Sequence, residues 1–466
     1  MQSVVAMKRT VPDFLVPKRF PKNDDMARKK LAELKRKLWV SKINDEIKHE
    51  FSIPSLPCRA QTGNTESKCN LLKLHAFYKK NTFPNQQKFG EDIVRLFAED
   101  SKKILCLAIA PTQSGKTGSM LSIVRNAMLH KNTSTYLHNC FVITAHSDKA
   151  WVTQTRKRFP TVMQNNIWHR NHLIQNAHKI KHIRDAWIIV DEAHIGCKVG
   201  QTLYRFLHAA GLFNIQSVLQ RNIKIVLFTA TPGELVHDVK SWKQCAETLN
   251  MDVPDAYLSV DKLLAQNRVL ECKPLCADDV SEQQNDVNED GSETHTDDVS
   301  EQQNDVMQNI REIIPFIHGF DAPKFHIIRT PRGKKHALVI KNFKKVFDNN
   351  FEFISEPTIR NFDSLFESSP EKHTFVFIKD KLRCAKTLEK DHIGVLYDRH
   401  VNHPNHASVL QGLLGRLTGF HNNSESVVFS NFLYSSKLFK HSADLSKSNK
   451  STASSTSCST SCWKIL

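Results

Sequence analysis

Short apolar runs alternate with longer amphipathic stretches along the first half of the chain, beginning near Phe83. Apolar runs bounded by polar turn residues are typical of buried strands, and the stretches between them have the spacing of helices. The alternation predicts an α/β fold, with a parallel sheet and helical crossovers. The predicted strands are Ile104–Ile109, Phe141–Thr144, Trp187–Val190 and Ile223–Phe228.

The same alternation returns in the second half of the chain and predicts another α/β domain. The predicted strands there are Phe325–Ile328, Phe351–Ile354, Thr374–Ile378, Ile393–Tyr397 and Ser426–Phe429.

An acidic, Gln/Asn-rich stretch separates the two alternating regions, and in it the sequence DDVSEQQNDV occurs twice, starting at Asp278 and Asp297. It contains too few apolar groups to offset the entropy lost on ordering, so we expect a disordered surface insertion. The sequence MARKKLAELKRKLW, after Asp24-Asp25, predicts a basic helix near the N-terminus. The Ser/Thr-rich residues beyond His441 predict a flexible tail.

These changes in composition and hydrophobic pattern along the chain predict six segments. They are a basic N-terminal extension (1–75), a first α/β domain (76–240), a connector (241–276), a disordered acidic insertion (277–309), a second α/β domain (310–440) and a Ser-rich flexible tail (441–466).

Composition and charge narrow the class of partner. The 466 residues include 65 Lys plus Arg against 48 Asp plus Glu, a net charge of +17, which favours a polyanion such as nucleic acid or an anionic membrane. No apolar run approaches the ~18 residues of a membrane-spanning helix. We therefore expect a soluble, intracellular protein with no membrane partner, and the sequence leaves nucleus and cytoplasm both open. The 11 cysteines are scattered and predict reduced thiols.

The strongest chemical signal follows the first predicted strand. There, APTQSGKT (110–117) leads from the strand into a helical pattern. The backbone N–H groups of such a loop bind phosphates, Lys116 neutralises their charge, and the Thr117 hydroxyl binds Mg²⁺. Ala110 stands where the general GxxxxGK[ST] pattern has its first Gly, and GKT after a strand also occurs by chance. The predicted phosphate-binding residues are Gln113, Ser114, Gly115, Lys116, Thr117 and Gly118.

A second signal lies at the end of the strand Trp187–Val190, where Asp191-Glu192-Ala193-His194 follows directly. An acid at the carboxyl end of a neighbouring strand can hold Mg²⁺, and the next acid can polarise an attacking water. We predict that Asp191 binds the metal and that Glu192 is the general base. The alternative is that these acids only cap a helix.

Together these residues resemble the motifs of superfamily 2 helicases and translocases of the DExH/DEAH type, over about residues 83–430. The resemblance implies two tandem RecA-like domains, with parallel sheets flanked by helices and ATP bound between them. It equates GKT with motif I, DEAH with motif II and Thr229-Ala230-Thr231 with motif III. His194, Thr229 and Thr231 would then couple the state of the nucleotide to domain closure. Val142–His146 is similar to motif Ia, which touches the nucleic-acid backbone.

The second half carries the family's other motifs. QGLLGRLTG (411–419) resembles motif VI, which implies that Gln411 belongs to the catalytic set and that Arg416 is an arginine finger. Its alternative is an amphipathic helix with a solvent-facing Arg416. The sequence departs from the family at Gly419, where a second Arg is common, and this departure puts efficient hydrolysis in doubt. Phe375–Lys379 looks like motif IV, while Val395–Arg399 lacks the Gly-rich signature of motif V.

Upstream of the phosphate loop, Phe83-Pro84-Asn85-Gln86-Gln87 is similar to the family's adenine-reading segment. A Gln amide can pair with the edge of adenine while an aromatic ring stacks on it, so Gln86 or Gln87 with Phe83 would favour ATP. A polar helix start is the alternative. The form of the 411–419 segment is most similar to helicase-type proteins of large DNA viruses and phages.

Three functions fit these observations. The first is an ATP- and Mg²⁺-dependent helicase or translocase that grips the backbone of DNA or RNA. The second is an ATPase motor subunit of a nuclease or packaging machine that does not unwind by itself. The third is a degenerate module that binds nucleic acid and ATP without hydrolysis, consistent with Ala110 and Gly419.

Overall fold

The structure is a computed structural model of the chain. The structure describes residues 65–130, 136–147, 150–277, 296–359, 364–379, 382, 388–404, 406–420 and 425–432. The chain divides into two compact units, Met1–Ala76 and Phe77–Leu466. Helix α2 (Thr65–Asn81) begins in the first unit. The predicted basic helix of the N-terminal extension and the predicted C-terminal tail lie outside the described residues.

The larger unit contains two sheets, which we call the first and second lobes together with the helices that cover them. The sheet of the first lobe has the strand order β3-β2-β4-β5-β1-β6, and its neighbouring strands pair in parallel. Its central strands are buried on both faces, which explains why they read as continuous apolar runs. The strands are β1 (Leu105–Ile109), β2 (Cys140–Thr144), β3 (Ile167–Trp168), β4 (Trp187–Asp191), β5 (Lys224–Thr229) and β6 (Ala246–Asn250).

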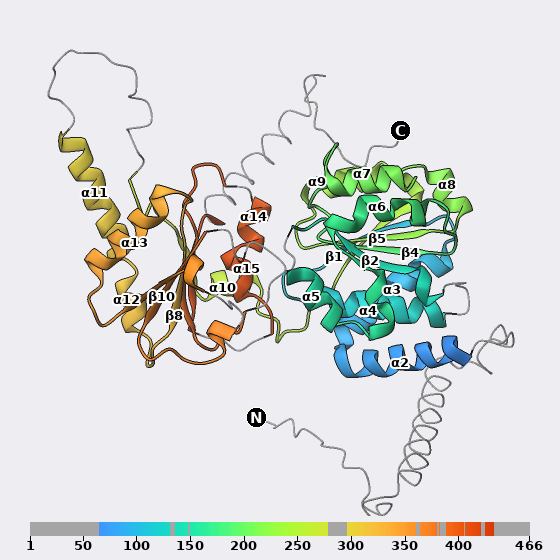
Figure 1. The fold of residues 1–466 in the computed structure, drawn as a ribbon, viewed down its shortest axis with the longest axis horizontal. Helices are drawn as coiled ribbons and strands as arrows, with labels where there is room; N and C mark the ends of the chain where they lie inside the picture. Colours follow the sequence, from blue (N-terminus) through green and yellow to red (C-terminus); the bar gives the residue numbers. More distant parts are fainter. Residues whose placement is uncertain are drawn as a thin grey trace, which may run out of the picture. The chain divides into compact units, whose positions relative to one another are not determined.

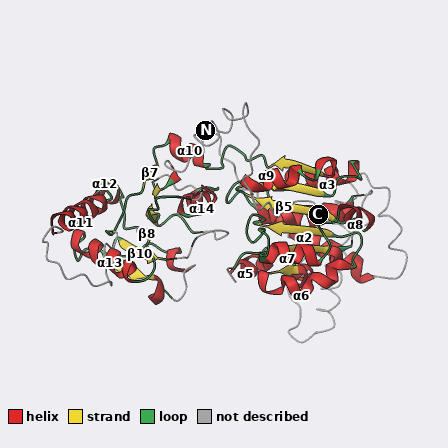
Figure 2. Ribbon diagram, turned by 90° about the horizontal axis from the view of Figure 1, so that it is seen from above, coloured by secondary structure: helices red, strands yellow, loops and turns green. Residues whose placement is uncertain are grey.

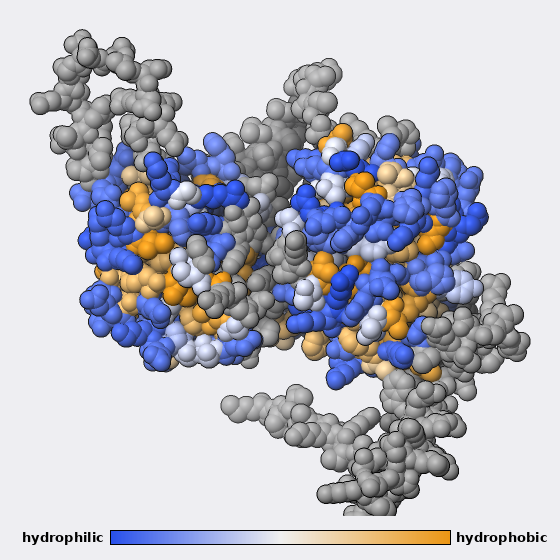
Figure 3. Space-filling model, in the orientation of Figure 1, coloured by the Kyte–Doolittle hydropathy of each residue, from blue (hydrophilic) through white to orange (hydrophobic). Residues whose placement is uncertain are grey.

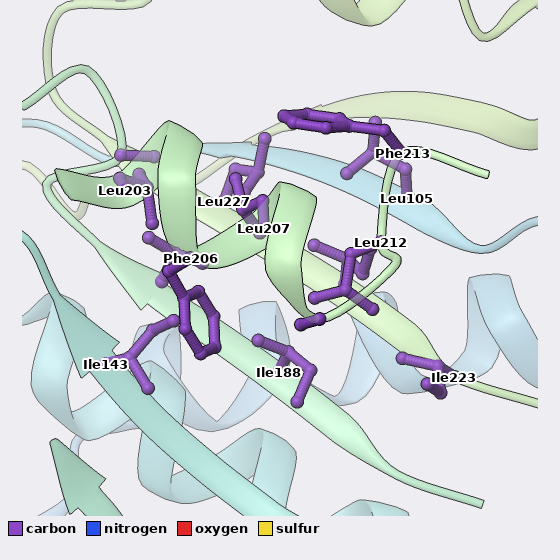
Figure 4. Packing of buried hydrophobic residues seen from close by; sticks show 14 of the residues in the cluster. Leu105, Ile143, Ile188, Leu203, Phe206, Leu207, Leu212, Phe213, Ile223 and Leu227 are labelled. Atoms are coloured by element: carbon purple, nitrogen blue, oxygen red, sulfur yellow. The ribbon is translucent and has the colours of Figure 1, made fainter. Parts of the chain in front are cut away.

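Helices cover both faces of this sheet (Figures 1 and 2). On one face Phe97 of α3 packs edge-on against Trp187, with ring centroids 5.3 Å apart. On the other face Phe206 of α7 lies over Ile143 and Ile188 (Figure 4). The helices are α3 (Pro84–Glu99), α4 (Lys116–Leu129), α5 (Ala150–Lys157), α6 (Arg170–Lys181), α7 (Thr202–Ala209), α8 (Ile215–Gln220) and α9 (Gly233–Lys240), with 3-10 helices Leu137–Asn139, Thr161–Asn166 and Lys243–Cys245.

The sheet of the second lobe has the order β7-β12-β11-β8-β10-β9, again with parallel neighbours. Its strands are β7 (Val269–Glu271), β8 (Phe325–Arg329), β9 (Glu352–Ser355), β10 (Thr374–Ile378), β11 (Ile393–Tyr397) and β12 (Val427–Ser430). The helices are α10 (Val260–Ala265), α11 (Thr296–Arg311), α12 (Ile314–His318), α13 (Lys334–Val346), α14 (His406–Gln411) and α15 (Leu413–Leu417), with 3-10 helices Glu356–Thr358 and Ser364–Phe366.

All nine strands expected from the sequence are present, with ends that differ by at most one residue. Three further strands were not expected: β3, β6 and β7. β3 has two residues, and β6 and β7 are sheet edges whose residues are partly exposed, so none shows a long apolar run. β6 and β7 both lie in the stretch predicted as a connector (241–276). The two sheets therefore extend into it from either side, joined by a segment that contains α10.

The prediction of disorder over 277–309 is wrong for residues 296–309. Helix α11 contains the second copy of the repeat, and its Val306 and Ile310 are 3% and 0% exposed. These side chains begin an apolar face that continues through Ile313 and Ile317, a spacing that a helix buries on one side. Most of this face comes from the isoleucines that follow the repeat, so the composition of the repeat did not predict it. The first copy lies outside the described residues.

The surface of the described residues is largely polar, as the face in Figure 3 shows. In the part of the chain that the structure describes, no helix has both the length and the apolar character needed to cross a bilayer. Five large hydrophobic side chains are exposed among these residues, and two of them are Phe83 and Phe420.

The parallel arrangement brings chemically important residues to one edge of the first sheet. The loop after β1 leads into α4, Asp191 is the last residue of β4, and Thr229 is the last residue of β5. Because β1, β4 and β5 run in the same direction in one sheet, their carboxyl ends lie at the same edge.

Two histidines contact each other at the second sheet, His326 in β8 and His373 directly before β10. His326 is 0% exposed; its Nδ1 accepts the Val395 N–H at 3.1 Å, and its Nε2 lies 3.0 Å from Nδ1 of His373. This network assigns the proton of neutral His326 to Nε2, because Nδ1 must accept. Burial lowers the pKa of His326 well below its usual value, and the charge of His373 when protonated lowers it further.

We expect the free energy of unfolding to fall as the pH drops below about 6.5, the pKa of histidine in an unfolded chain. His326 has a lower pKa when folded, so the unfolded chain binds the proton first, with a limiting slope of about 1.4 kcal/mol per pH unit for each such proton. His326→Gln keeps an acceptor without titrating, so its denaturant-measured stability should fall less steeply between pH 7 and 5. An unchanged slope in this variant would contradict the assignment.

Candidate active site

The loop between β1 and α4 has the geometry of an anion-binding turn. Gly115 caps α4 with φ of 97°, in the left-handed region, and Gln113 also has positive φ, at 60°. Lys116 and Thr117 are the first residues of α4, so the N–H groups of its first turn point toward the loop. Ala110, where the general pattern has Gly, is 0% exposed, and its N–H donates to Thr229 O at 2.9 Å. An alanine methyl group therefore fits at this position.

The side chain of Gln86 packs against this loop. A Cβ atom on Gly115 would lie 1.9 Å from Gln86 Nε2, and one on Gly118 would lie 1.9 Å from Gln86 Oε1. The amide is thus held directly against both glycines. Gln86 Oε1 also accepts the Phe83 N–H at 3.1 Å, which forms half of a capping box at the start of α3. Both glycines are needed because a side chain at either one would displace this amide.

Glu192 forms the charged centre of the site. It is 3% exposed and has φ of 51°, a left-handed conformation that is uncommon outside glycine. Its Oε1 lies 3.0 Å from Lys116 Nζ, and its Oε2 accepts a hydrogen bond from Gln411 Nε2 at 3.0 Å. The loop of the first lobe and the α14 end of the second lobe thus both donate to one buried carboxylate.

The pKa values of the two adjacent acids, Asp191 and Glu192, shift in opposite directions. Burial and the neighbouring charge of Glu192 raise the pKa of Asp191 to about 6, against the opposing effects of Lys116 and a hydrogen bond from Trp151. Burial also acts to raise the pKa of Glu192, but the charge and the hydrogen bond of Lys116 act against it, and that pKa lies below its usual value. Glu192 is therefore ionised at neutral pH, which the predicted role of a general base requires.

The three residues predicted to couple nucleotide state to domain closure are linked by hydrogen bonds. His194 Nδ1 lies 3.1 Å from Thr229 Oγ1, which also accepts the Thr231 N–H at 3.1 Å. Thr231 Oγ1 in turn accepts from Gln411 Nε2 at 3.2 Å. Burial lowers the pKa of His194, which favours the neutral ring. The chain of contacts joins the end of β5 to the second lobe.

Arg416 lies at the same boundary and is 1% exposed. Its Nη2 donates to Gln411 O at 3.0 Å and its Nε to Gly412 O at 3.3 Å, both carbonyls of the preceding turn. The interpretation of Arg416 as a solvent-facing residue is therefore wrong. Gln113 Nε2 donates to Gly415 O at 3.1 Å and to Arg416 O at 3.2 Å, so the phosphate loop contacts this helix directly.

A cavity of about 430 Å³ lies between these residues, lined from both lobes. Its walls include Gln113, Gly115, Lys116, Thr117, Gly118, Asp191, Glu192, Gln411 and Arg416, with Phe83 and Gln86 from α3 and its cap. Ser114 is buried beneath the loop, where its Oγ donates to Met251 Sδ at 3.4 Å. Gln87 does not line the cavity, and its Nε2 donates to Thr82 Oγ1 at 2.9 Å. The structure thus brings together most of the predicted residues and leaves Gln87 out.

Several residues of the cavity were not expected from the sequence. Trp151, Gln154 and Arg158 come from α5 and the residue after it, and Phe420 follows the turn after α15. Phe420 stacks loosely on Phe83, with ring centroids 6.3 Å apart and an angle of 27°. No motif marked these positions. The sequence offered only a general expectation for α5, namely that a helix that follows β2 packs beside the carboxyl end of a neighbouring strand.

The donor set at the cavity fits a hard divalent cation. Thr117 offers a hydroxyl and Asp191 a carboxylate, the oxygen ligands that Mg²⁺ binds together with phosphate oxygens. Among the described residues, no cluster of three or more His, Cys, Asp or Glu side chains is placed to hold a metal without such phosphates. Asp398, in the segment Val395–Arg399 that stands in the place of motif V, forms a buried ion pair with Arg329 at 2.8 Å.

Comparison with known proteins shows the fold. No family model matches the chain. It is similar to the solved structure of Mss116p bound to ssRNA and AMP-PNP, with a TM-score of 0.51 and 16% identity over 79% of this chain and 75% of that one. The Escherichia coli DEAH/RHA helicase HrpB has a TM-score of 0.43 and 13% identity, over 72% and 41% of the two chains. The likeness to Mss116p shows two tandem RecA-like domains.

One curated protein is similar in sequence. It is the uncharacterized protein L594 of Acanthamoeba polyphaga mimivirus, 32% identical over 110 residues. The match covers 22% of this chain and 28% of the viral protein, so it spans little more than a quarter of that protein's length.

The bracing of the loop by Gln86 can be tested with a pair of substitutions. Gly118→Ala should lower stability by about 1–3 kcal/mol, because the new methyl group overlaps the Gln86 amide. In a Gln86→Ala background the same change should cost much less, since the space is then vacant. Chemical denaturation of the four proteins of this cycle measures the coupling. Additive costs would show that Gln86 does not occupy the space beside Gly118.

Proposed function

We propose that the chain is a nucleic-acid-dependent ATPase of the superfamily 2 helicase type, which uses ATP hydrolysis to move along or separate strands of DNA or RNA. One observation carries the proposal. Gln411 of the second lobe donates to Glu192 of the first, on the same carboxylate that pairs with Lys116. Residues with the chemistry of phosphate binding, base catalysis and charge sensing thus meet at one cavity between two lobes.

The chain's own groups suit attack of water on a terminal phosphate. Lys116 and the N-terminus of α4 would bind the β- and γ-phosphates, which compete with Glu192 for the ammonium. The carboxylate that this competition releases would accept a proton from the attacking water, with Gln411 holding its other oxygen. Thr117 and Asp191 would hold Mg²⁺, which when bound neutralises phosphate charge.

Arg416 would act as the arginine finger. Arg416 lines the cavity, and its guanidinium donates two of its N–H groups to carbonyls of its own turn, which hold it at the cavity while further N–H groups are left to bind a phosphate. Gln113 contacts the carbonyl of Arg416 itself, so a shift of the loop on binding phosphate is transmitted to that residue. The hydrogen-bonded chain of His194, Thr229 and Thr231, which reaches Gln411, offers a second route from nucleotide binding to lobe movement.

The base would be held mainly by stacking. Phe83 is 63% exposed and Phe420 is 37% exposed, and the two rings face each other at the cavity from different lobes. A planar base between them requires a separation of about 7 Å, only slightly more than the present one. Gln86 lines the cavity, but its Oε1 already accepts the Phe83 N–H. We therefore assign adenine contact to Phe83, Phe420 and the remaining Gln86 amide, and none to Gln87.

A nucleic-acid partner is supported by charge and by the fold. The net charge of +17 favours a phosphate backbone, and Mss116p, which shares the fold, was solved with ssRNA. A strand-displacement assay beside an ATPase assay, with single-stranded DNA, duplex DNA and RNA in parallel, separates a helicase from a motor that does not unwind. Binding of ATP without turnover under all these conditions would select the non-hydrolysing module.

Lys116→Ala and Glu192→Gln should each lower polymer-stimulated ATP turnover at least 100-fold, because one removes the phosphate-binding cation and the other the base. Glu192→Gln should still bind ATP, whereas Lys116→Ala should bind it weakly. Lys181→Ala, an exposed lysine of α6 that does not line the cavity, is the matched control and should keep full turnover. Wild-type turnover in both site variants would reject the proposal.

Phe420→Ala should raise the KM for ATP about tenfold, equivalent to about 1.4 kcal/mol of lost stacking, with a smaller effect on kcat. Steady-state kinetics at saturating polymer measures both constants. Tyr136→Ala, which removes another exposed aromatic ring outside the cavity, serves as the comparison and should leave KM unchanged. An unchanged KM in Phe420→Ala would place the base elsewhere.

A further inference from the structure

The indole of Trp151 makes a direct contact with the acid at the end of β4. Trp151, in the first turn of α5, is 4% exposed, and its Nε1–H donates to Asp191 Oδ2 at 2.7 Å. The contact is short and buried. It brings a side chain from a different segment onto the carboxylate that we expect to hold the metal.

With this bond, each oxygen of the Asp191 carboxylate accepts a hydrogen bond. The other oxygen, Asp191 Oδ1, accepts the N–H of Glu192 at 3.1 Å, and the main-chain oxygen of Asp191 accepts from Thr144 Oγ1 at 3.1 Å. The terminal torsion of an aspartate is broad, so one donor leaves the plane of the carboxylate free to turn. A donor on each oxygen fixes it.

We propose that Trp151 is a positioning residue for magnesium-nucleotide binding, which holds the Asp191 carboxylate in the orientation that the metal requires. The inference rests on the proposed function. Mg²⁺ demands near-ideal octahedral geometry, so the direction of each ligand or water-bridging oxygen matters. A carboxylate has further lone pairs beyond those that the two donors occupy, so Trp151 can orient Asp191 without blocking the metal.

A purely apolar role explains the contact less well. Indole packs well in many places, but its N–H must find an acceptor when it is buried. Trp168 of β3 shows the ordinary solution in the same lobe: it is 6% exposed, and its Nε1 donates to the main-chain oxygen of Asn165 at 3.0 Å. Trp151 instead uses a charged carboxylate at the wall of the cavity, a stronger kind of bond that also affects the acceptor.

Trp151→Phe tests the proposal, with Trp168→Phe as the matched control, both in the full chain. Binding of Mn²⁺ in the presence of AMP-PNP, followed by electron paramagnetic resonance, reports the metal directly without turnover. Loss of a group that orients a metal ligand typically lowers affinity by about 10- to 100-fold. We expect a metal affinity at least tenfold weaker in Trp151→Phe and unchanged in Trp168→Phe, with AMP-PNP binding in EDTA the same in all three proteins.

Each other outcome has a distinct meaning. Wild-type Mn²⁺ affinity in Trp151→Phe would overturn the inference and leave the proposed function intact. Equal loss of AMP-PNP binding with and without metal would also overturn it, because Trp151 would then contact the nucleotide itself. If wild type binds neither Mn²⁺ nor AMP-PNP, both the inference and the proposed function fail. Should Trp151→Phe not fold, Trp151→Tyr, which keeps a ring with a hydroxyl donor, takes its place and should lose less metal affinity than Trp151→Leu.

Discussion

The structure is organised around a carboxylate that is removed from water. An ionised acid as deeply buried as Glu192 is stable only when donors surround it, because loss of hydration costs several kcal/mol. Lys116 supplies one donor from the phosphate loop, and Gln411 supplies another from the second lobe. The electrostatic demand of one side chain therefore ties the N-terminus of α4 to the end of α14. A ligand that binds Lys116 in place of Glu192 leaves this buried carboxylate with fewer donors and so changes its interaction with Gln411 of the second lobe.

A second linkage joins the parts of the cavity that we propose bind the base and the phosphates. Gln86 accepts the Phe83 N–H while its amide lies against Gly115 and Gly118. The same side chain thus sets the start of α3, where the Phe83 ring is exposed, and the curvature of the loop after β1. The resemblance to an adenine-reading segment and the alternative of a polar helix start do not exclude each other, because one residue serves the helix cap and lines the cavity.

Much of this arrangement could be predicted from the sequence. Buried parallel strands require continuous apolar runs, so β1, β4, β5, β8 and β10 were visible, and the chemistry at their carboxyl ends followed from GKT and DEAH. Strands β3, β6 and β7 and helix α11, which contains the second copy of the repeat, were missed because their patterns are short or mixed. Trp151 and Phe420 were missed for another reason. Their importance depends on which distant residues they contact, and neither spacing nor composition carries that information.

Gly419 has a consequence for how this site can change. Its φ is +116°, and a Cβ there would lie 3.2 Å from Gln113 Oε1 and 3.3 Å from Lys390 Nζ. Lys390 itself is buried and donates to the carbonyls of Leu417 and Thr418. An arginine introduced at 419 would meet a strained backbone and a like charge in the same place. Replacement of Gly419 by arginine is therefore disfavoured both by the backbone and by the neighbours at 113 and 390.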